Sequence, residues 1–305
     1  MLKKALLVGI NEYQDAKLRG CVNDVMEMKN VLTDILGFQA ENIRLLRNHE
    51  ATKKGITEGL TWLAADGGSA PATRVFHYAG HGHYLPDQDG EEGEGGRDEA
   101  LVPYGSDKKD YLIDDELKKL YDRVPPQDNL TLIMDCCHSG NNQRAPDADI
   151  VYRFIPNTFQ ERKAIMEARR KFNQELNEFM QQELKGRGLR TVRRGPDEEY
   201  EQIYNESRKK FEQMRFGDRR VQENNILLAA CQDDQKAADA QMEGGVYHGA
   251  FTFFLVQLLR ESQGQITYRE IAEQLGENLY EFQFQQLPQL ECKEGRQAAA
   301  FLSAS

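Results

Sequence analysis

Four short apolar runs limit the folds that this chain of 305 residues can adopt. They are ALLVGI (5–10), RVFHYAG (74–80), LTLIMD (130–135) and NILLAAC (225–231), and a weaker fifth run is NIRLL (42–46). Each run is continuous rather than alternating, and glycine or polar residues follow it, as in the strands of a parallel sheet that is covered on both faces. The runs therefore predict a buried, mostly parallel sheet.

Helical patterns lie between these runs. Residues 21–38 carry apolar side chains on one stripe that stops at Gly37, and residues 52–66 and 114–124 show similar patterns. After the fourth run, two more helices are expected at 249–262 and 267–282. Because strand and helix alternate, the sequence predicts an α/β fold, with a mostly parallel central sheet flanked by helices on both faces.

The composition changes after Pro146. Residues 159–185 form a charged helical pattern with apolar side chains at helical spacing, and a second helical pattern covers 197–216. Between them, the stretch KGRGLRTVRRGP is basic and broken by glycine and proline. We expect 150–222 to be a helical-hairpin insertion with an exposed, mobile tip, placed within one α/β domain between the regions 1–149 and 223–305.

Charge and cysteine content restrict the partners and the compartment. A formal net charge of -11 gives no general affinity for nucleic acid. The five cysteines include no C-x-x-C pair in a chain of this size, which favours a reducing cytoplasm over a disulfide framework. No apolar run approaches the ~18 residues that a membrane span needs, and the apolar stretch 5–10 is too short for a signal peptide. We expect a cytoplasmic protein that binds neither membrane nor nucleic acid.

Two of the four runs end in reactive side chains. The second run leads into HYAGHGHY, which contains His77, His81 and His83, and the third leads into DCCHSG, residues 135–140. Because functional groups collect at the carboxyl edge of a parallel sheet, an imidazole and a thiol are expected to meet there. Strand alternation directs His77 into a helix-covered face as a core histidine.

The side chains beyond the strand ends are the better candidates for chemistry. His81 lies between two glycines, which allow the backbone to approach a ligand, so that the N–H of Gly82 is able to face a scissile carbonyl. Cys136 continues the strand and is expected to pack as a small apolar residue. Cys137 stands at the turn, where a side chain can be presented to solvent.

Three interpretations of this cluster compete. The first is a hydrolase in which Cys137 is the nucleophile and His81 is its proton-transfer partner. The second is a zinc site drawn from these histidines and cysteines, although their spacing does not match the usual short patterns. The third is structural, with buried thiols and hydrogen-bonded histidines that perform no chemistry.

The two motifs resemble the signatures of metacaspases, the caspase-related cysteine peptidases. His81 in HYAGHG lies 56 positions before Cys137 in DCCHSG, and further similar stretches are KALLVGINEY, LRGCVNDV, RDEALVPYGSD and LLAACQDDQKAADA. These stretches follow one another in the order of type I-like metacaspases, and together they cover most of 1–145 and 224–260. Residues 150–222 have no match and occupy the place of the linker between the large- and small-subunit regions. The resemblance implies a caspase-like fold.

The resemblance also implies an activity and its residues. It implies a cysteine endopeptidase that cleaves protein or peptide substrates after arginine or lysine, with Cys137 and His81 as a catalytic dyad. The N–H groups of Gly82 and Cys137 are implied to hold the oxyanion. Asp24 and Asp135 match the acids that bind the basic side chain. An alternative role for Asp24 is a helix N-terminal carboxylate that interacts with the helix dipole.

Calcium activation is a further implication of the resemblance, and no organic cofactor is expected. Asp98, Asp114 and Asp115 match the positions of calcium ligands, and carboxylate oxygens are the ligands that calcium prefers. The family's further aspartate after the cysteine is absent, because NNQRAP stands there. Asp114 and Asp115 are equally suited to begin the helix 114–124.

The basic linker has two competing interpretations. If the enzyme prefers basic residues, Arg187, Arg190, Arg193 and Arg194 are self-cleavage sites. Alternatively, the hairpin is a docking arm for a partner or for a second copy. For the whole chain, the alternative to a peptidase is a catalytically silent caspase-fold module that mediates protein interaction, and the sequence predicts no oligomeric state.

Overall fold

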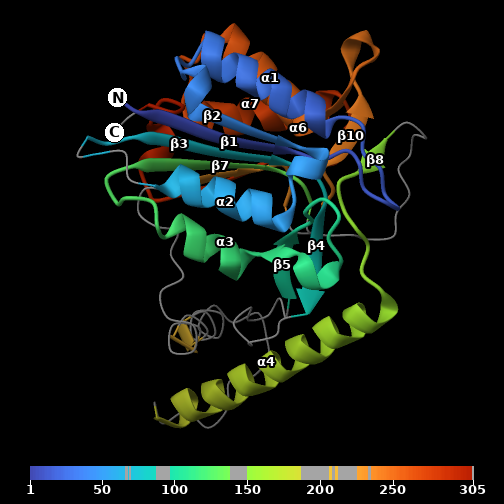
Figure 1. Cartoon of the computed structure of the whole chain (residues 1–305). Coiled ribbons are helices and arrows are strands. Elements are labelled where there is room, and N and C mark those ends of the chain that lie inside the picture. Colours follow the sequence, from blue (N-terminus) through green and yellow to red (C-terminus); the bar gives the residue numbers. More distant parts are fainter. Residues whose placement is uncertain are drawn as a thin grey trace. The chain divides into compact units, whose positions relative to one another are not determined.

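The computed structural model describes residues 1–65, 68, 70–86, 97–137, 150–186, 206–207, 210–211, 225–232 and 235–303. Figure 1 shows the chain with its elements labelled. It divides into two compact units, of which the first contains Met1–His83, Glu99–Pro156 and Val221–Ser305 and the second contains Tyr84–Asp98 and Asn157–Arg220.

A six-stranded sheet of order β12-β9-β7-β3-β1-β2 is the centre of the first unit. Its strands are β1 (Lys3–Gly9), β2 (Ile43–Arg47), β3 (Thr73–Ala79), β7 (Asn129–Asp135), β9 (Asn225–Ala229) and β12 (Gln289–Cys292). All neighbours pair in parallel except β12, which is antiparallel to β9. The mostly parallel sheet predicted from the apolar runs is confirmed, and the antiparallel edge strand is an addition.

Helices cover both faces of this sheet (Figure 1). On one face lie α1 (Cys21–Asp34), α6 (Ala250–Glu261) and α7 (Tyr268–Glu281), and on the other lie α2 (Lys53–Ala64) and α3 (Asp114–Tyr121). Two of these helices begin at side-chain caps: Thr52 accepts the Gly55 N–H at the start of α2, and Thr267 forms a capping box with Glu270 at the start of α7. The structure confirms the helices predicted within 21–38, 52–66, 114–124, 249–262 and 267–282. In the described ranges, no helix combines the length and the apolarity that crossing a membrane requires.

Short strands and 3-10 turns complete the list of elements. One small sheet has the order β11-β10-β8, with β8 (Val151–Tyr152), β10 (Ala238–Gln241) and β11 (Tyr247–Gly249). Another has the order β4-β5-β6, with β4 (Gly82–Pro86), β5 (Arg97–Leu101) and β6 (Leu112–Ile113). The 3-10 turns are Ala40–Asn42, Asn48–Glu50, Lys108–Asp110, Glu243–Gly245 and Arg296–Ala298.

A buried ion pair lies at the amino ends of two central strands. Arg74 in β3 and Asp128 just before β7 are 0% and 2% exposed, and their side chains are 2.5 Å apart. Arg74 also donates to the carbonyls of Leu63 and Ala65, and Asp128 accepts the Ala72 N–H at 2.8 Å. These contacts join α2 to the sheet at the edge opposite the strand ends that carry the reactive residues.

The second unit contains the long helix α4 (Phe159–Gly186), which confirms the first predicted helix of the insertion. Phe172, Leu176 and Met180 of α4 form an apolar cluster against which Phe211 packs. Of the second predicted helix, the structure describes residues 206–207 and 210–211, which are helical. The arginines predicted as self-cleavage sites, Arg187, Arg190, Arg193 and Arg194, lie outside the described residues.

Candidate active site

The reactive residues of the two sequence motifs leave the same edge of the central sheet. β3 and β7 are hydrogen-bonded neighbours, and the last residue of one, Ala79, is opposite the last residue of the other, Asp135. His81 and Cys137 each follow two residues later. Because the strands are parallel and level at their ends, both side chains belong to one region above the carboxyl edge.

His81 is buried as a neutral imidazole. Its side chain Nε2 is 2.6 Å from the carbonyl oxygen of Ala16, and its backbone N–H donates to the hydroxyl of Tyr13 at 2.9 Å. A carbonyl only accepts, so Nε2 carries the hydrogen and Nδ1 is the basic nitrogen of the neutral ring. Nδ1 is buried and has no hydrogen-bond partner among the described residues. Burial lowers the pKa of His81 to about 4.

Cys137 is buried instead of being presented to solvent, so the expectation of an exposed thiol is wrong. The reason is the chain segment after β9, which covers the turn: the Ala237 N–H donates to Cys137 Sγ, and the Ala237 carbonyl lies 3.6 Å from the same sulfur. A hydrogen bond with Cys137 and burial raise the pKa of the neighbouring Cys231. Within the described structure, no hydrogen bond joins the side chains of Cys137 and His81.

The two predicted pocket acids bind an arginine of the chain itself. Arg153 is completely buried, and its Nη2 lies 2.5 Å from Asp24 while its Nη1 lies 3.0 Å from Asp135. Asp24 belongs to the first turn of α1 and Asp135 ends β7. We call the site formed by these two carboxylates around the guanidinium the acidic recess.

The first turn of α6 holds both carboxylates in place. Thr252 donates its N–H and its hydroxyl to Asp135 Oδ2, and the Gly249 N–H donates to both oxygens of Asp24, at 3.2 and 3.0 Å. His248 Nδ1 lies 2.9 Å from Asp24 Oδ1. Backbone N–H groups at a helix N-terminus favour negative charge, so α6 stabilises the acids of the recess.

The two carboxyl groups of the acidic recess differ in pKa. Burial and the neighbouring Asp24 raise the pKa of Asp135 to about 6, although Arg153 and Thr252 oppose this shift. Burial also disfavours the charge of Asp24, but Arg153 and His248 outweigh it and hold the Asp24 pKa below its usual value. Despite its burial, the pKa of Arg153 is raised well above its usual value, because Asp135 and Asp24 favour its charged form.

A third buried carboxylate, that of Asp239 in β10, fixes the start of α1. Its Oδ2 accepts the N–H groups of Arg19 at 2.9 Å and of Gly20 at 3.1 Å. Burial raises the pKa of Asp239, and the charge of Arg153 opposes the shift. Because Asp24 lies in the first turn of α1, the Asp239 contacts help to set the position of the recess.

The backbone of Arg153 is held as firmly as its side chain. Its carbonyl oxygen accepts the N–H groups of Gly82 and Cys137, both at 3.1 Å, and its own N–H donates to the Ala237 carbonyl at 3.0 Å. The two donors are the N–H groups that the sequence analysis assigned to the oxyanion hole. Arg153 thus has its carbonyl oxygen between these two N–H donors and its guanidinium in the acidic recess.

Several residues of this region were not found by the sequence analysis, namely Arg153, Ala237, Asp239, His248 and Thr252. A signal for Arg153 was present, because IVYRFIP is a short apolar stretch with a single cation inside it. A lone arginine between apolar residues is rarely buried unless carboxylates pair with it, which could have linked it to Asp24 and Asp135. The others stand in AADA and YHGAFT, stretches that contributed to the family resemblance or to a predicted helix but in which no single residue was assigned a role.

The other predicted residues are the core histidine His77 and the aspartates that match calcium ligands. His77 is buried in β3, where its Nε2 is 3.3 Å from the Thr252 hydroxyl. Asp98 is buried, while Asp114 and Asp115 begin α3, where Asp114 accepts the Asp115 N–H at 3.1 Å. Across the described ranges, no three His, Cys, Asp or Glu side chains are arranged to hold a metal ion. Calcium binding by the three aspartates stays a prediction, and no catalytic step is assigned to a metal.

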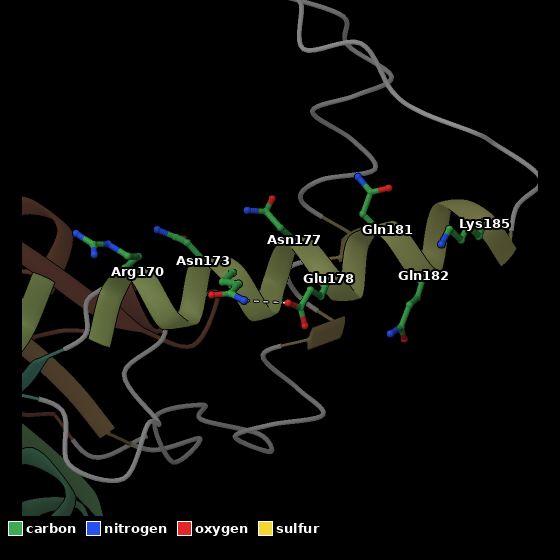
Figure 2. A pocket seen from close by; sticks show the side chains of 8 residues that line it. Arg170, Asn173, Asn177, Glu178, Gln181, Gln182 and Lys185 are labelled. Atoms are coloured by element: carbon green, nitrogen blue, oxygen red, sulfur yellow. Dashed lines mark hydrogen bonds between the residues drawn. The ribbon is translucent and has the colours of Figure 1, made fainter. Parts of the chain in front are cut away.

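A cavity of about 640 Å³ lies along α4 of the second unit. Figure 2 shows its polar lining, in which Gln174 donates to Glu178 at 3.1 Å. The lining residues are Arg170, Asn173, Gln174, Asn177, Glu178, Gln181, Gln182 and Lys185. None of these described residues is a cysteine or a histidine, so the described part of the lining offers no nucleophile of the kind found at the sheet edge.

Comparisons with known proteins agree with the motifs. The family model of the metacaspase peptidase C14 domain matches residues 3–146. Metacaspase-1 of Scheffersomyces stipitis is 31% identical over 308 residues, which cover 95% of this chain and 70% of that protein. Metacaspase-4 of Arabidopsis thaliana is 41% identical over 146 residues, which cover 46% of this chain and 34% of that protein.

The fold also has a solved counterpart. The crystal structure of a protein from Geobacter sulfurreducens aligns over 100% of both chains with a TM-score of 0.62 at 19% identity, which shows a shared fold. The match to Metacaspase-1 extends over nearly all of this chain and over more than two thirds of the relative. This chain therefore belongs to the metacaspase family of cysteine-type peptidases.

Proposed function

We propose that this chain is an endopeptidase that cleaves after arginine or lysine, with Cys137 as the nucleophile and His81 as the proton carrier. One observation carries the proposal: Arg153 lies with its guanidinium between Asp24 and Asp135 and with its carbonyl oxygen between two N–H donors. This arrangement resembles a bound substrate whose cleaved bond follows an arginine.

The acidic recess accounts for the preference for a basic side chain. Two carboxylates facing one guanidinium form charge-assisted hydrogen bonds, which are stronger than neutral ones. Arg153 makes one such contact with each acid. An acidic side chain in the same place would be repelled and would lose its hydration without compensation. Lysine offers a single ammonium and is expected to be accepted less well than arginine.

The oxyanion site is formed by the N–H groups of Gly82 and Cys137. Both lie 3.1 Å from the Arg153 carbonyl oxygen, which stands for the carbonyl of a substrate. When sulfur adds to the carbonyl carbon, this oxygen gains negative charge and the two hydrogen bonds strengthen. Removing one donor in comparable sites costs about 3–4 kcal/mol of transition-state stabilisation.

Proton transfer is assigned to His81. Nδ1 is the basic nitrogen, because Nε2–H is held by the Ala16 carbonyl. We infer that the thiol of Cys137 turns from the Ala237 N–H towards His81 and gives its proton to Nδ1, after which the thiolate attacks. The imidazolium then protonates the leaving amine, and the neutral ring takes a proton from the water that hydrolyses the thioester.

Self-processing follows from the same arrangement. Because Arg153 already lies in the recess, we infer that the Arg153–Phe154 bond is a self-cleavage site, in addition to the linker arginines proposed from the sequence. Purified wild type and Cys137→Ala would be incubated with and without calcium, and new N-termini would be identified by mass spectrometry. A fragment that begins at Phe154 in wild type alone is the expected result.

The same samples test the specificity with fluorogenic peptides that carry arginine, lysine or aspartate before the cleaved bond. We expect wild type to cleave the arginine and lysine peptides. Cys137→Ala should show only the background rate. Cleavage after aspartate would contradict the assignment of the recess. If both proteins cleave every peptide only at the background rate, the alternative is favoured, namely a catalytically silent caspase-fold module that mediates protein interaction.

Calcium activation is proposed only from the match of Asp98, Asp114 and Asp115 to the family pattern. Its test is the rate of arginine-peptide cleavage by wild type and by Asp115→Asn over a calcium titration. A calcium response that the substitution reduces would support the proposal, and equal rates with and without calcium would remove it.

A further inference from the structure

The chain's own segment 151–155 is held along its main chain on both sides of Arg153. On the amino side, β8 pairs antiparallel with β10, with Tyr152 opposite Ala238. On the carboxyl side, the Ile155 N–H donates to the Gly82 carbonyl at 3.0 Å, and His83 Nδ1 donates to the Ile155 carbonyl at 2.7 Å. A peptide bound in this way adds a strand to β10, and its side chains meet fixed groups of the protein.

The side chain before the arginine contacts a lysine. Lys236 Nζ lies 4.7 Å from the centre of the Tyr152 ring, within the range of a cation–π interaction. Both residues are partly exposed, so the contact is open to a substrate side chain in place of Tyr152. A basic residue here would face the ammonium of Lys236, whereas an aromatic residue gains an attraction.

The side chain after the arginine contacts a histidine. The rings of Phe154 and His83 are stacked, with centres 6.2 Å apart and an interplanar angle of 26°. His83 is completely buried, and its ring meets Tyr111 edge-on at 5.3 Å, which fixes its orientation. A flat apolar ring fits this surface better than a small or charged side chain.

From these contacts we propose that the preferred substrates are extended segments with an aromatic residue on each side of the arginine, recognised by Lys236 before the cleaved bond and by His83 after it. The inference rests on the proposed function, because it takes the Arg153–Phe154 bond as the model of a cleaved bond. It adds two subsites to the acidic recess.

The test uses internally quenched peptides of the sequence Val-Tyr-Arg-Phe-Ile, in which Tyr is replaced by Phe, Ala or Lys, or the Phe after arginine by Ala or Asp. Wild type and Lys236→Met are compared, with Lys54→Met on α2, an exposed lysine, as the matched control. Tyr and Phe are expected to exceed Ala before the arginine by about two- to fivefold in kcat/KM. Lys is expected to be the poorest.

The preference before the arginine is expected to fall in Lys236→Met and to persist in Lys54→Met. After the arginine, Phe is expected to exceed both Ala and Asp in all three proteins. Equal rates for all peptides that contain arginine would overturn the two subsites while leaving the proposed function intact. If no arginine peptide is cleaved whatever its neighbours, the proposed function itself fails.

Discussion

Thr252 donates two hydrogen bonds to Asp135 Oδ2, one from its backbone N–H at 3.1 Å and one from its hydroxyl at 2.5 Å. The contact joins the first turn of α6 to the last residue of β7, although 117 positions separate the two residues. It fixes the carboxylate that meets the guanidinium, so Thr252 is a positioning residue for the acidic recess.

Replacing Thr252 should therefore weaken arginine binding. Thr252→Val removes the hydroxyl and keeps the shape, while Thr252→Ser keeps the hydroxyl. A hydrogen bond to a charged group contributes about 1.5–3 kcal/mol, so KM for arginine peptides should rise about tenfold or more in the valine variant and little in the serine variant. Separate measurement of KM and kcat, with a melting curve for each protein, checks this. Equal KM values for the two variants would show that the hydroxyl has no positioning role.

Arginine recognition should depend on pH through Asp135, whose pKa is raised to about 6. As the pH falls through this value Asp135 gains a proton, whereas Asp24, with its lowered pKa, keeps its charge. At pH 5 about a tenth of Asp135 remains ionised, so KM for an arginine peptide should rise between pH 7 and pH 5. In Asp135→Asn, KM should be high and nearly independent of pH over this range. A wild-type KM that stays constant down to pH 5 would contradict the assignment.

Gly249 leaves the space that the guanidinium occupies. A Cβ at this position would collide with Asp135 Oδ2 and with Arg153 Nη1, while the backbone φ of -69° is acceptable for alanine. Gly249→Ala should abolish cleavage after arginine at peptide concentrations that saturate wild type. Gly276→Ala is the control, because a Cβ there would lie at an ordinary contact distance, 3.7 Å, from Leu287. Unchanged arginine cleavage by Gly249→Ala would place the substrate side chain elsewhere.

The buried pair Arg74–Asp128 should matter for stability and not for specificity. Removing one partner of a buried ion pair costs about 3–5 kcal/mol, so Asp128→Ala should lower the free energy of unfolding by about that amount. Glu58→Gln, which removes the exposed partner of Lys54, should change it by less than about 1 kcal/mol. Urea unfolding of both variants checks the difference. The ratio of arginine to lysine cleavage should remain that of wild type in any Asp128→Ala that folds.

The sheet and its helices could be predicted because their signals are local. The apolar run LTLIMD became β7 as a whole, and the stripe of residues 21–38 became α1 up to Asp34. The order of the strands also brought His81 and Cys137 to one edge, since the carboxyl ends of neighbouring parallel strands are level.

The sequence marks Arg153 as a cation in need of buried acids, but which acids bind it depends on long-range contacts. Arg153 meets Asp24 across 129 positions, and Cys137 meets Ala237 across 100. No local pattern specifies either pairing. The burial of Cys137 was missed for the same reason, since the segment that covers it follows a different strand.

The pairing of β8 with β10 affects how any other peptide reaches this edge. A segment attached to the same molecule competes at an effective concentration in the millimolar range when its tether is short and flexible. A free peptide whose dissociation constant exceeds this effective concentration binds only after residues 151–153 have detached. The expected kinetic signature of this strand pairing is a lag before the steady rate of cleavage, and the length of the lag does not depend on the enzyme concentration.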